Sequence, residues 1–379
     1  MAIYSASSCQ PNAASAVAEI GQQLGPHQSQ LLLFFCSTHY QQQELGEALQ
    51  QQFPNSCIVG CTSAGELSPN GYAHNSITAV SFASHGNFVA SALIQNIAEF
   101  SLTDSQELVD NLLDQCQQHG VADVNNNTLA ITLLDGLSIR EEAFLQVLNA
   151  FLGHIPLLGG SAGDDLHFEH TEVFYQGQFY RNAAVLLVIN TRHPFSSFSH
   201  HHLQPKQEKM VVTHADSARR RVYELNGLPA AQEYARLCDL PVNKLTNLQY
   251  ALHPLTIKIG DSYYARSVQQ AHTDGSLSFY SAIELGVVLT DAAPKDLVQQ
   301  TALWLDQLQQ DIGPPQLVLT FDCILRSIEI EHCNLHLPMN ELLQDYKMAG
   351  FSTYGEQMGG SHLNHTFTGV YFGCINGPQ

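Results

Sequence analysis

The sequence predicts an α/β protein of two α/β modules, in which mixed, partly parallel sheets are flanked by helices and built around repeated strand-turn-strand units. Two observations carry this prediction. Apolar runs of strand length alternate with segments of helical character. A short phrase of Ser or Thr, any residue, Gly and an acid also recurs three times, as Ser63-Ala64-Gly65-Glu66, Ser161-Ala162-Gly163-Asp164 and Thr353-Tyr354-Gly355-Glu356.

Each copy of the phrase ends an apolar run and precedes a second β-like run. Glycine permits positive φ, and a nearby hydroxyl or carboxylate can bond the backbone amides that the turn frees. The phrase therefore predicts a tight turn that follows a buried strand. A duplicated building block and independent use of the same turn chemistry both explain the recurrence.

Strands and helices alternate in the first half of the chain, which favours a partly parallel sheet with antiparallel pairs added near 75–95 and 172–190. The expected helices are 12–24, 41–53, 104–119 and 141–152. The expected strands are 31–36, 57–60, 88–95, 128–134 and 157–158.

The regular pattern breaks at 191–209, where Pro, Ser, Phe, His and Gln replace it, and a domain boundary is expected there or shortly after. A chain of 379 residues also exceeds the size that one hydrophobic core usually serves, so two domains are expected. Beyond the break, the sequence predicts helices at 229–237 and 294–310 and strands at 211–213, 255–259, 263–268 and 317–321.

The chain is strongly acidic, with 15 Lys and Arg against 35 Asp and Glu and a formal net charge of -20. Such a surface repels nucleic acid phosphates and anionic membranes, so neither partner is expected. Only 13% of residues are charged, which favours protein partners or a homo-oligomer. The nine cysteines lack paired spacing, and no signal sequence or membrane span is found, so a cytoplasmic location is expected.

Histidines gather near the break in the pattern, at His193, His200, His201, His202 and His214. Neutral imidazole binds haem iron and transition metals when its second nitrogen is held and its surroundings are apolar. The side chains that could wall a porphyrin there are Phe195, Phe198 and Leu203. An exposed polar loop is the alternative, and neighbouring residues of an extended segment face opposite ways, so only alternate histidines could share a site.

Asp322 and Arg326 lie in an otherwise apolar stretch, where a buried charge needs a partner. The candidate ion pairs are Asp322 with Arg326 and Arg326 with Glu356. A ligand carboxylate or haem propionate held by Arg326 is the functional alternative. Nucleophile signatures are weak, because no catalytic triad can be assigned around Ser161.

Six segments occur together in a specific order: 59–66, 135–138, 158–164, 266–267, 321–326 and 350–357. Through them the chain resembles the FIST family of sensory proteins over nearly its whole length. The resemblance implies an N-terminal module at about 30–220 and a C-terminal module at about 221–360. It also implies that these modules act as input domains of bacterial signal transduction.

Within the family, the stand-alone architecture is most similar to the nitric-oxide-sensing haem proteins of the NosP group, in segments 211–213, 222–230 and 264–267. This resemblance implies a haem-based nitric oxide sensor, with the iron of a b-type haem bound through histidine. The implied partner is a sensor histidine kinase or a cyclic-di-GMP synthase or phosphodiesterase that controls biofilm or quorum behaviour. The chain itself is expected to catalyse nothing.

The resemblance implies His202 as the first choice of iron ligand, because residues 202–205 match the pattern of the group, and His362 as the second. His200 and His201 leave the register of the ligand open, and Phe198 and Arg326 complete the expected haem site. One rival interpretation is a haem-free sensor of an amino-acid-like ligand, held by the glycine turns and Arg326. Another is a hydrolase that uses Ser161 or Cys323.

Overall fold

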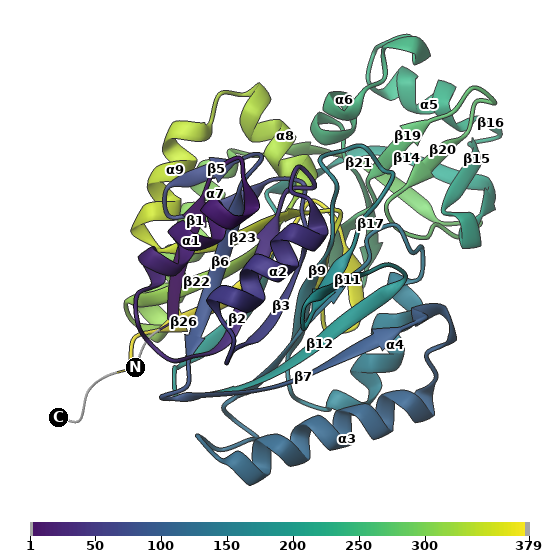
Figure 1. Ribbon diagram of the computed structural model, residues 1–379. Coiled ribbons are helices and arrows are strands. Elements are labelled where there is room, and N and C mark those ends of the chain that lie inside the picture. The colour runs from purple at the N-terminus through teal and green to yellow at the C-terminus, as the bar shows by residue number, and fades with distance from the viewer. Residues whose placement is uncertain (1–2, 376–379) are drawn as a thin grey trace.

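The computed structural model describes residues 3–375, and within that range it has three six-stranded sheets, one eight-stranded sheet and nine α-helices (Figure 1). The α/β prediction with mixed sheets is therefore confirmed. The three six-stranded sheets follow one plan, and each is built around a repeat. A repeat consists of an outer strand, a helix, a central strand, a further helix or pair of helices, a parallel strand, a hairpin and a returning antiparallel strand.

The first repeat covers residues 3–83. Its elements are β1 (Ile3–Ser8), α1 (Ala13–Leu24), β2 (Ser29–Cys36), α2 (Gln42–Gln52), β3 (Cys57–Thr62) and β6 (Ile77–Ala83). The Asn12 side chain caps α1 by accepting a hydrogen bond from the Ser15 amide. β2 and β3 pair in parallel because α2 returns the chain across the sheet, and β6 pairs antiparallel with β1 and β2.

The second repeat covers residues 87–191. Its elements are β7 (Asn87–Gln95), the short helix η1 (Ile97–Glu99), α3 (Leu102–His119), β8 (Thr128–Leu134), α4 (Glu141–Leu152), β9 (Leu157–Ser161) and β12 (Ala183–Thr191). Ser101 and Asp104 form a capping box at the start of α3. β8 and β9 pair in parallel, and β12 lies antiparallel between β7 and β8.

The third repeat begins at residue 195 and ends at residue 373. Its elements are β13 (Phe195–His200), α7 (Leu297–Ile312), β22 (Pro315–Cys323), α8 (Ile324–His332), α9 (His336–Asp345), β23 (Met348–Thr353) and β26 (Phe367–Gly373). β22 and β23 again pair in parallel, and β26 lies antiparallel between β13 and β22.

Each repeat sends its hairpin to the sheet of another repeat. The hairpins are β4 (Glu66–Ser68) with β5 (Gly71–Ala73), β10 (Val173–Tyr175) with β11 (Gln178–Tyr180), and β24 (Gly355–Met358) with β25 (Ser361–Leu363). β4 pairs with β23 of the third repeat, β10 with β3 of the first and β24 with β9 of the second. The exchange is cyclic, and each hairpin follows a turn phrase, so the phrase marks a building block that is present three times.

An eight-stranded sheet is inserted into the third repeat, between β13 and α7, and lies to one side of the three repeats in Figure 1. Its strands are β14 (Leu203–Asp216), β15 (Arg221–Leu225), β16 (Leu228–Pro229), β17 (Leu255–Ile259), β18 (Ser262–Ala265), β19 (Val268–Ala271), β20 (Leu277–Phe279) and β21 (Val288–Pro294). Its helices are α5 (Ala230–Leu237), α6 (Asn247–Leu252) and the short η2 (Ser217–Arg219) and η3 (Val242–Lys244).

The three repeats share one inner core. Phe35 of the first sheet stacks on Phe351 of the third with ring centroids 4.4 Å apart, and Ile131 of the second sheet belongs to the same apolar cluster. The outer face of each sheet is covered by its own helices, which are α1 and α2, α3 and α4, and α7 and α9 (Figure 1). Burial of both faces explains why the central strands are continuous apolar runs in the sequence.

The segment 191–209, expected to lack a regular pattern, instead contains β13 and the first half of β14. β14 is largely exposed between Gln204 and Lys209, so few apolar side chains mark it as a strand. The expected limit between the two modules, at residue 220, falls between η2 and β15 and remains a prediction. Among residues 3–375, no helix combines the length and apolarity needed to cross a bilayer.

Candidate ligand-binding site

The three turn phrases meet at the centre of the molecule through backbone hydrogen bonds. The amide donors and their carbonyl acceptors are Ala64 to Ser352 at 3.0 Å, Gly163 to Thr62 at 3.1 Å and Tyr354 to Ser161 at 3.2 Å. Each bond thus joins one phrase to another phrase or to the residue that immediately precedes it. The phrases form a structural node that holds the three repeats together.

Glycine is needed in the three phrases for two different reasons. Gly65 has a φ of +120°, as the turn chemistry predicts. Gly163 and Gly355 do not have positive φ, but neither has room for a side chain. A Cβ at Gly163 would lie 2.8 Å from the Ala64 Cβ, and one at Gly355 would lie 1.7 Å from the His362 Nε2.

The acids of the first and third phrases are buried and hydrogen-bonded within their own turns. Glu66 accepts from the hydroxyls of Ser63 and Ser76, and Glu356 accepts from those of Thr353 and Thr366. Burial raises the pKa of each of the two carboxyl groups to about 8. These acids stabilise the node and are not available to a ligand.

Arg326 is wholly buried and takes part in an internal ion pair. Its Nε donates to Oδ1 of Asp322 at 2.5 Å, which confirms the first of the two expected pairs. The second expected pair, with Glu356, does not form, because the Glu356 carboxylate is engaged in its own turn. Arg326 is therefore held by the protein, and its guanidinium does not line the cavity described below.

His202 belongs to the same network. Its Nδ1 lies 3.1 Å from Nη1 of Arg326, and its Nε2 lies 2.8 Å from Oε2 of Glu329. Burial lowers the pKa of the His202 imidazole well below its usual value, and it raises the pKa of Glu329 to about 7. Both ring nitrogens of His202, the first-choice iron ligand, are thus engaged inside the protein.

A cavity of about 460 Å³ lies where the third repeat meets the inserted sheet. Its walls include Ser197 and Phe198 of β13, Trp304 of α7 and Tyr263 of β18. Two connecting segments add His201, between β13 and β14, and Asn364, between β25 and β26. No Asp, Glu, Lys or Arg is among its lining residues.

Of the four candidate histidines, His201 lines this cavity. Its Nε2 lies 3.0 Å from the Tyr263 carbonyl oxygen, and its Nδ1 accepts a hydrogen bond from the Leu203 amide at 3.3 Å. His200 stacks on Trp304 instead, with ring centroids 5.1 Å apart, and its buried Nε2 has no partner. Burial lowers the pKa of both imidazoles, that of His200 to about 4, so both are neutral at pH 7.

Haem iron needs an imidazole nitrogen that is free of hydrogen bonds and faces a large apolar space. His201 and His202 have both nitrogens engaged, whereas His200 and His362 have free nitrogens but do not line the cavity. Phe198 lines the cavity, as expected of a haem wall. These four candidate histidines nevertheless do not fit an axial ligand, and haem remains a prediction from the resemblance.

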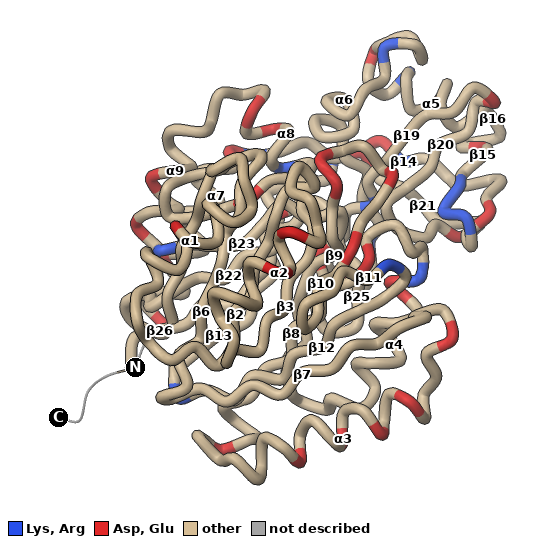
Figure 2. The backbone as a smooth tube through the Cα atoms, in the orientation of Figure 1, with Lys and Arg blue, Asp and Glu red and all other residues tan. Residues whose placement is uncertain are grey.

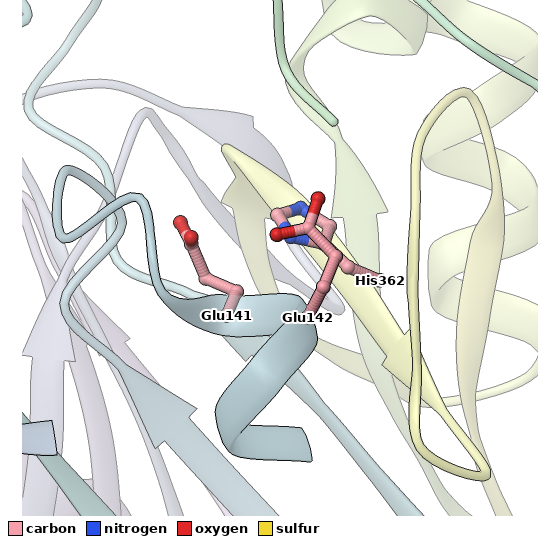
Figure 3. A group of neighbouring side chains, drawn as sticks. All are labelled: Glu141, Glu142 and His362. Carbon is pink, nitrogen blue, oxygen red and sulfur yellow. The ribbon is translucent and has the colours of Figure 1, made fainter. Parts of the chain in front are cut away.

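A second cluster consists of Glu141 and Glu142 at the start of α4 and His362 of β25 (Figure 3). Their potential ligand atoms lie within 4.8 Å of one another. Figure 3 shows the Glu142 carboxylate beside the His362 ring, with Glu141 turned to the other side. Burial raises the pKa of Glu141 to about 7 and lowers that of His362 to about 3.

Arg220, which follows η2 in the inserted sheet, neutralises this cluster. Its Nη2 lies 2.5 Å from a Glu141 carboxylate oxygen and also donates to Glu142. A divalent cation would be repelled by this guanidinium. The cluster is therefore an ion-pair clamp between the second repeat and the inserted sheet, and the chemistry of its residues disfavours a metal site.

In Figure 2 the basic segment 219–221 lies beside β15, while acidic residues are scattered over the surface.

The two residues of the hydrolase interpretation are both buried in the body of the protein, Ser161 at 0% and Cys323 at 1% exposure. The Ser161 hydroxyl contacts the Gln357 amide at 3.4 Å. Burial raises the pKa of the Cys323 thiol well above its usual value, so the thiolate is disfavoured. Neither group is placed as an accessible nucleophile.

Sequence reasoning missed most of the cavity wall, including Tyr263, Trp304 and Asn364. Trp304 is the only tryptophan of the chain, and Asn364 lies in the segment that also contains His362. The single tryptophan and the segment around His362 are both visible in the sequence. Their closeness in space is not, because the three residues come from distant segments that only the folded chain brings together.

Three repeats around one core, with a further sheet inserted in the third, define a mixed α/β protein. A model of the FIST N domain matches residues 30–228, and a model of the FIST C domain matches residues 230–359. The chain therefore belongs to the FIST family, whose domains are sensory domains. It is also 23% identical over 395 residues to the uncharacterized protein MJ1623 of Methanocaldococcus jannaschii, a match that covers 93% of this chain and 76% of that protein.

Proposed function

We propose that this protein is the sensory input component of a signalling pathway and binds a small organic ligand in the cavity between the third repeat and the inserted sheet. The observation that carries the proposal is the cavity itself. Its volume of about 460 Å³ is in the range of small-molecule sites, and its wall combines apolar and aromatic side chains with uncharged polar groups.

The position of the cavity suggests how binding is transmitted. One part of its wall, Ser197 and Trp304, belongs to the third repeat, and another part, Tyr263, belongs to the inserted sheet. A ligand that touches both parts stabilises one arrangement of the two. Ligand binding shifts the populations of the two arrangements only as far as the binding free energies for them differ. A useful signal therefore needs a difference of a few kcal/mol.

His201 lies at the junction of the two parts. It follows β13 of the third repeat, and its ring bonds the carbonyl of Tyr263 in β18 of the inserted sheet. A ligand that moves this ring changes a contact between repeat and insert. A partner protein then recognises the altered surface, and the family resemblance suggests a sensor histidine kinase or a cyclic-di-GMP enzyme for this role.

Nitric oxide sensing through haem is an alternative form of the sensory function and rests on the resemblance to the NosP group. The positions of the four candidate histidines do not support it, so no step of the mechanism is assigned to haem. The neutral wall of the cavity likewise lacks a charge that would hold haem propionates.

A thermal-shift screen of a metabolite library that includes haem tests the proposal. Ser197→Trp fills the cavity, and Ser196→Trp, at the neighbouring position of β13 that does not line the cavity, is the matched control. We expect at least one compound to raise the melting temperature of the wild type and of Ser196→Trp but not of Ser197→Trp. Ligand binding that Ser197→Trp leaves unchanged would place the site elsewhere. A Soret band that appears with haem and moves with nitric oxide would establish the haem form.

A further inference from the structure

The residues that line the cavity also restrict the chemistry of its ligand, an inference that rests on the proposed function. We propose that the cavity binds an uncharged, planar organic molecule that offers carbonyl-type hydrogen-bond acceptors to Trp304 and Asn364. This class differs from both the amino-acid-like ligand and the haem considered from the sequence. Three features of the cavity support it.

The first feature is the absence of fixed charge. The lining residues include no Asp, Glu, Lys or Arg, and burial lowers the pKa of His201, so its ring is neutral at pH 7. A buried ionic group costs several kcal/mol unless an opposite charge or strong hydrogen bonds compensate it. A zwitterion or a carboxylate would lose its hydration in this cavity and find no counterion.

The second feature is a pair of hydrogen-bond donors without partners. Nε1 of Trp304 and Nδ2 of Asn364 are buried and unpaired. The amide oxygen of Asn364 is already bonded to the Ser281 hydroxyl at 2.6 Å, so its remaining capacity is for donation. Two unpaired N–H donors favour a ligand that brings acceptors, because a buried donor without a partner is destabilising.

The third feature is the aromatic wall. Phe198, Tyr263, Tyr264 and Trp304 supply flat surfaces, and Met358 and Leu363 add apolar contacts. The indole of Trp304 is held in place by its nearly parallel stack on His200, with an interplanar angle of 9°. Flat, preorganised walls favour a planar ring system, since stacking and apolar burial then cost little ordering of the protein.

The single tryptophan of the chain makes a direct test possible, because Trp304 gives the only indole N–H resonance in a nitrogen-proton correlation spectrum. The probes share one ring system: acetylnaphthalene carries an uncharged carbonyl, ethylnaphthalene has no acceptor, naphthoate is an anion and naphthylmethylamine is a cation. We expect acetylnaphthalene to shift the indole resonance. Its affinity should exceed that of each of the other three probes by about 10-fold, the worth of one satisfied hydrogen bond.

Two variants separate donor loss from misfolding. Asn364→Leu removes one donor and should weaken acetylnaphthalene about 10-fold while changing ethylnaphthalene little. Trp304→Phe tests the second donor in the same way, at a half-buried position where a smaller ring is tolerated, with calorimetry as the readout.

The outcomes distinguish this inference from the proposed function. Tightest binding by naphthoate or naphthylmethylamine would overturn the uncharged ligand class while leaving the cavity as the site. Equal affinity of acetylnaphthalene and ethylnaphthalene would show that the two donors take no part, for instance because water satisfies them. If Ser197→Trp weakened the binding of no probe and of no library compound, both the ligand class and the proposed function would fail.

Discussion

The Arg220 guanidinium lies 2.5 Å from the Glu141 carboxylate and also bonds Glu142, and these contacts join the inserted sheet to the first turn of α4. The Arg220 and Glu141 side chains are 9% and 0% exposed. A buried pair is costly to break, because removal of one partner leaves the other charge unpaired in a poorly solvated place. The clamp is therefore a sensitive point of the contact between the two parts.

Replacement of Arg220 by methionine should lower the free energy of unfolding by about 3–5 kcal/mol, because it leaves the buried Glu141 beside the half-buried Glu142 without a positive partner. Urea denaturation followed by circular dichroism measures the change. Arg219→Met is the matched control, since the neighbouring Arg219 side chain is 77% exposed and its pair with Asp216 is worth less than about 1 kcal/mol. Equal effects of the two substitutions would contradict the clamp.

Stability should fall as the pH rises toward 8, because of the turn acids Glu66 and Glu356. Burial raises the folded pKa of each to about 8, from 4.5 in the unfolded chain. Between these values the folded protein holds protons that the unfolded chain releases. The stabilisation is therefore complete below the unfolded pKa and is lost as the pH rises through the folded pKa, by about 1.4 kcal/mol per pH unit for each carboxyl at most.

Glu66→Gln should remove one of these contributions, because an amide does not titrate and its oxygen can still accept the hydrogen bond from the Ser76 hydroxyl. The free energy of unfolding of the variant, measured from pH 5 to pH 8, should decline less steeply than that of the wild type. Glu107→Gln at an exposed position of α3 is the control. A wild-type slope in Glu66→Gln would show that Glu66 is ionised in the folded protein.

The ion pair of Asp322 and Arg326 should be essential to the third repeat. Asp322→Asn leaves a wholly buried guanidinium without its carboxylate, so a loss of about 3–5 kcal/mol is expected. Chemical denaturation gives the value, and Asp216→Asn, at the exposed pair with Arg219, is the comparison. A loss below 1 kcal/mol would mean that His202 and Thr301 suffice to hold Arg326.

Gly355→Ala should destabilise the protein because its Cβ would lie 1.7 Å from the Nε2 of His362. Overpacking of this kind costs about 1–3 kcal/mol, and more if the ring cannot move. The double variant with His362→Ala creates the missing space, so the alanine at 355 should cost much less in that background. Equal costs in both backgrounds would locate the strain in the backbone and not in the contact with His362.

Much of the fold could be predicted from local pattern. Helices expected at 12–24, 41–53 and 141–152 correspond to α1, α2 and α4, because apolar periodicity and end signals such as Asn12 are properties of neighbouring residues. The recurrence of the turn phrase indicated repetition, and its ending in an acid indicated a bonded turn. The pair of Asp322 and Arg326 was also predictable, since two opposite charges stand close together in an otherwise apolar stretch, where a buried charge needs a partner.

The site was predicted less well. Sequence similarity pointed to His202, but the neighbouring His201 lines the cavity, and His202 fills a slot between Arg326 and Glu329. A shift of one residue along an extended segment reverses the direction in which every side chain points, and no local sequence signal decides between the two registers. The cyclic exchange of hairpins was equally invisible, because the choice of partner sheet depends on contacts across hundreds of residues.

The sequence alone determined that this protein is a mixed α/β member of a sensory family, with repeated turns, buried charges that require partners and an acidic surface. These properties follow from composition, periodicity and short motifs, which act over a few residues. Only the tertiary structure decided that three repeats enclose one core, that an inserted sheet meets them at a neutral cavity and which histidine faces it. Those features depend on which distant side chains share a space, and packing and desolvation set that only when the whole chain folds.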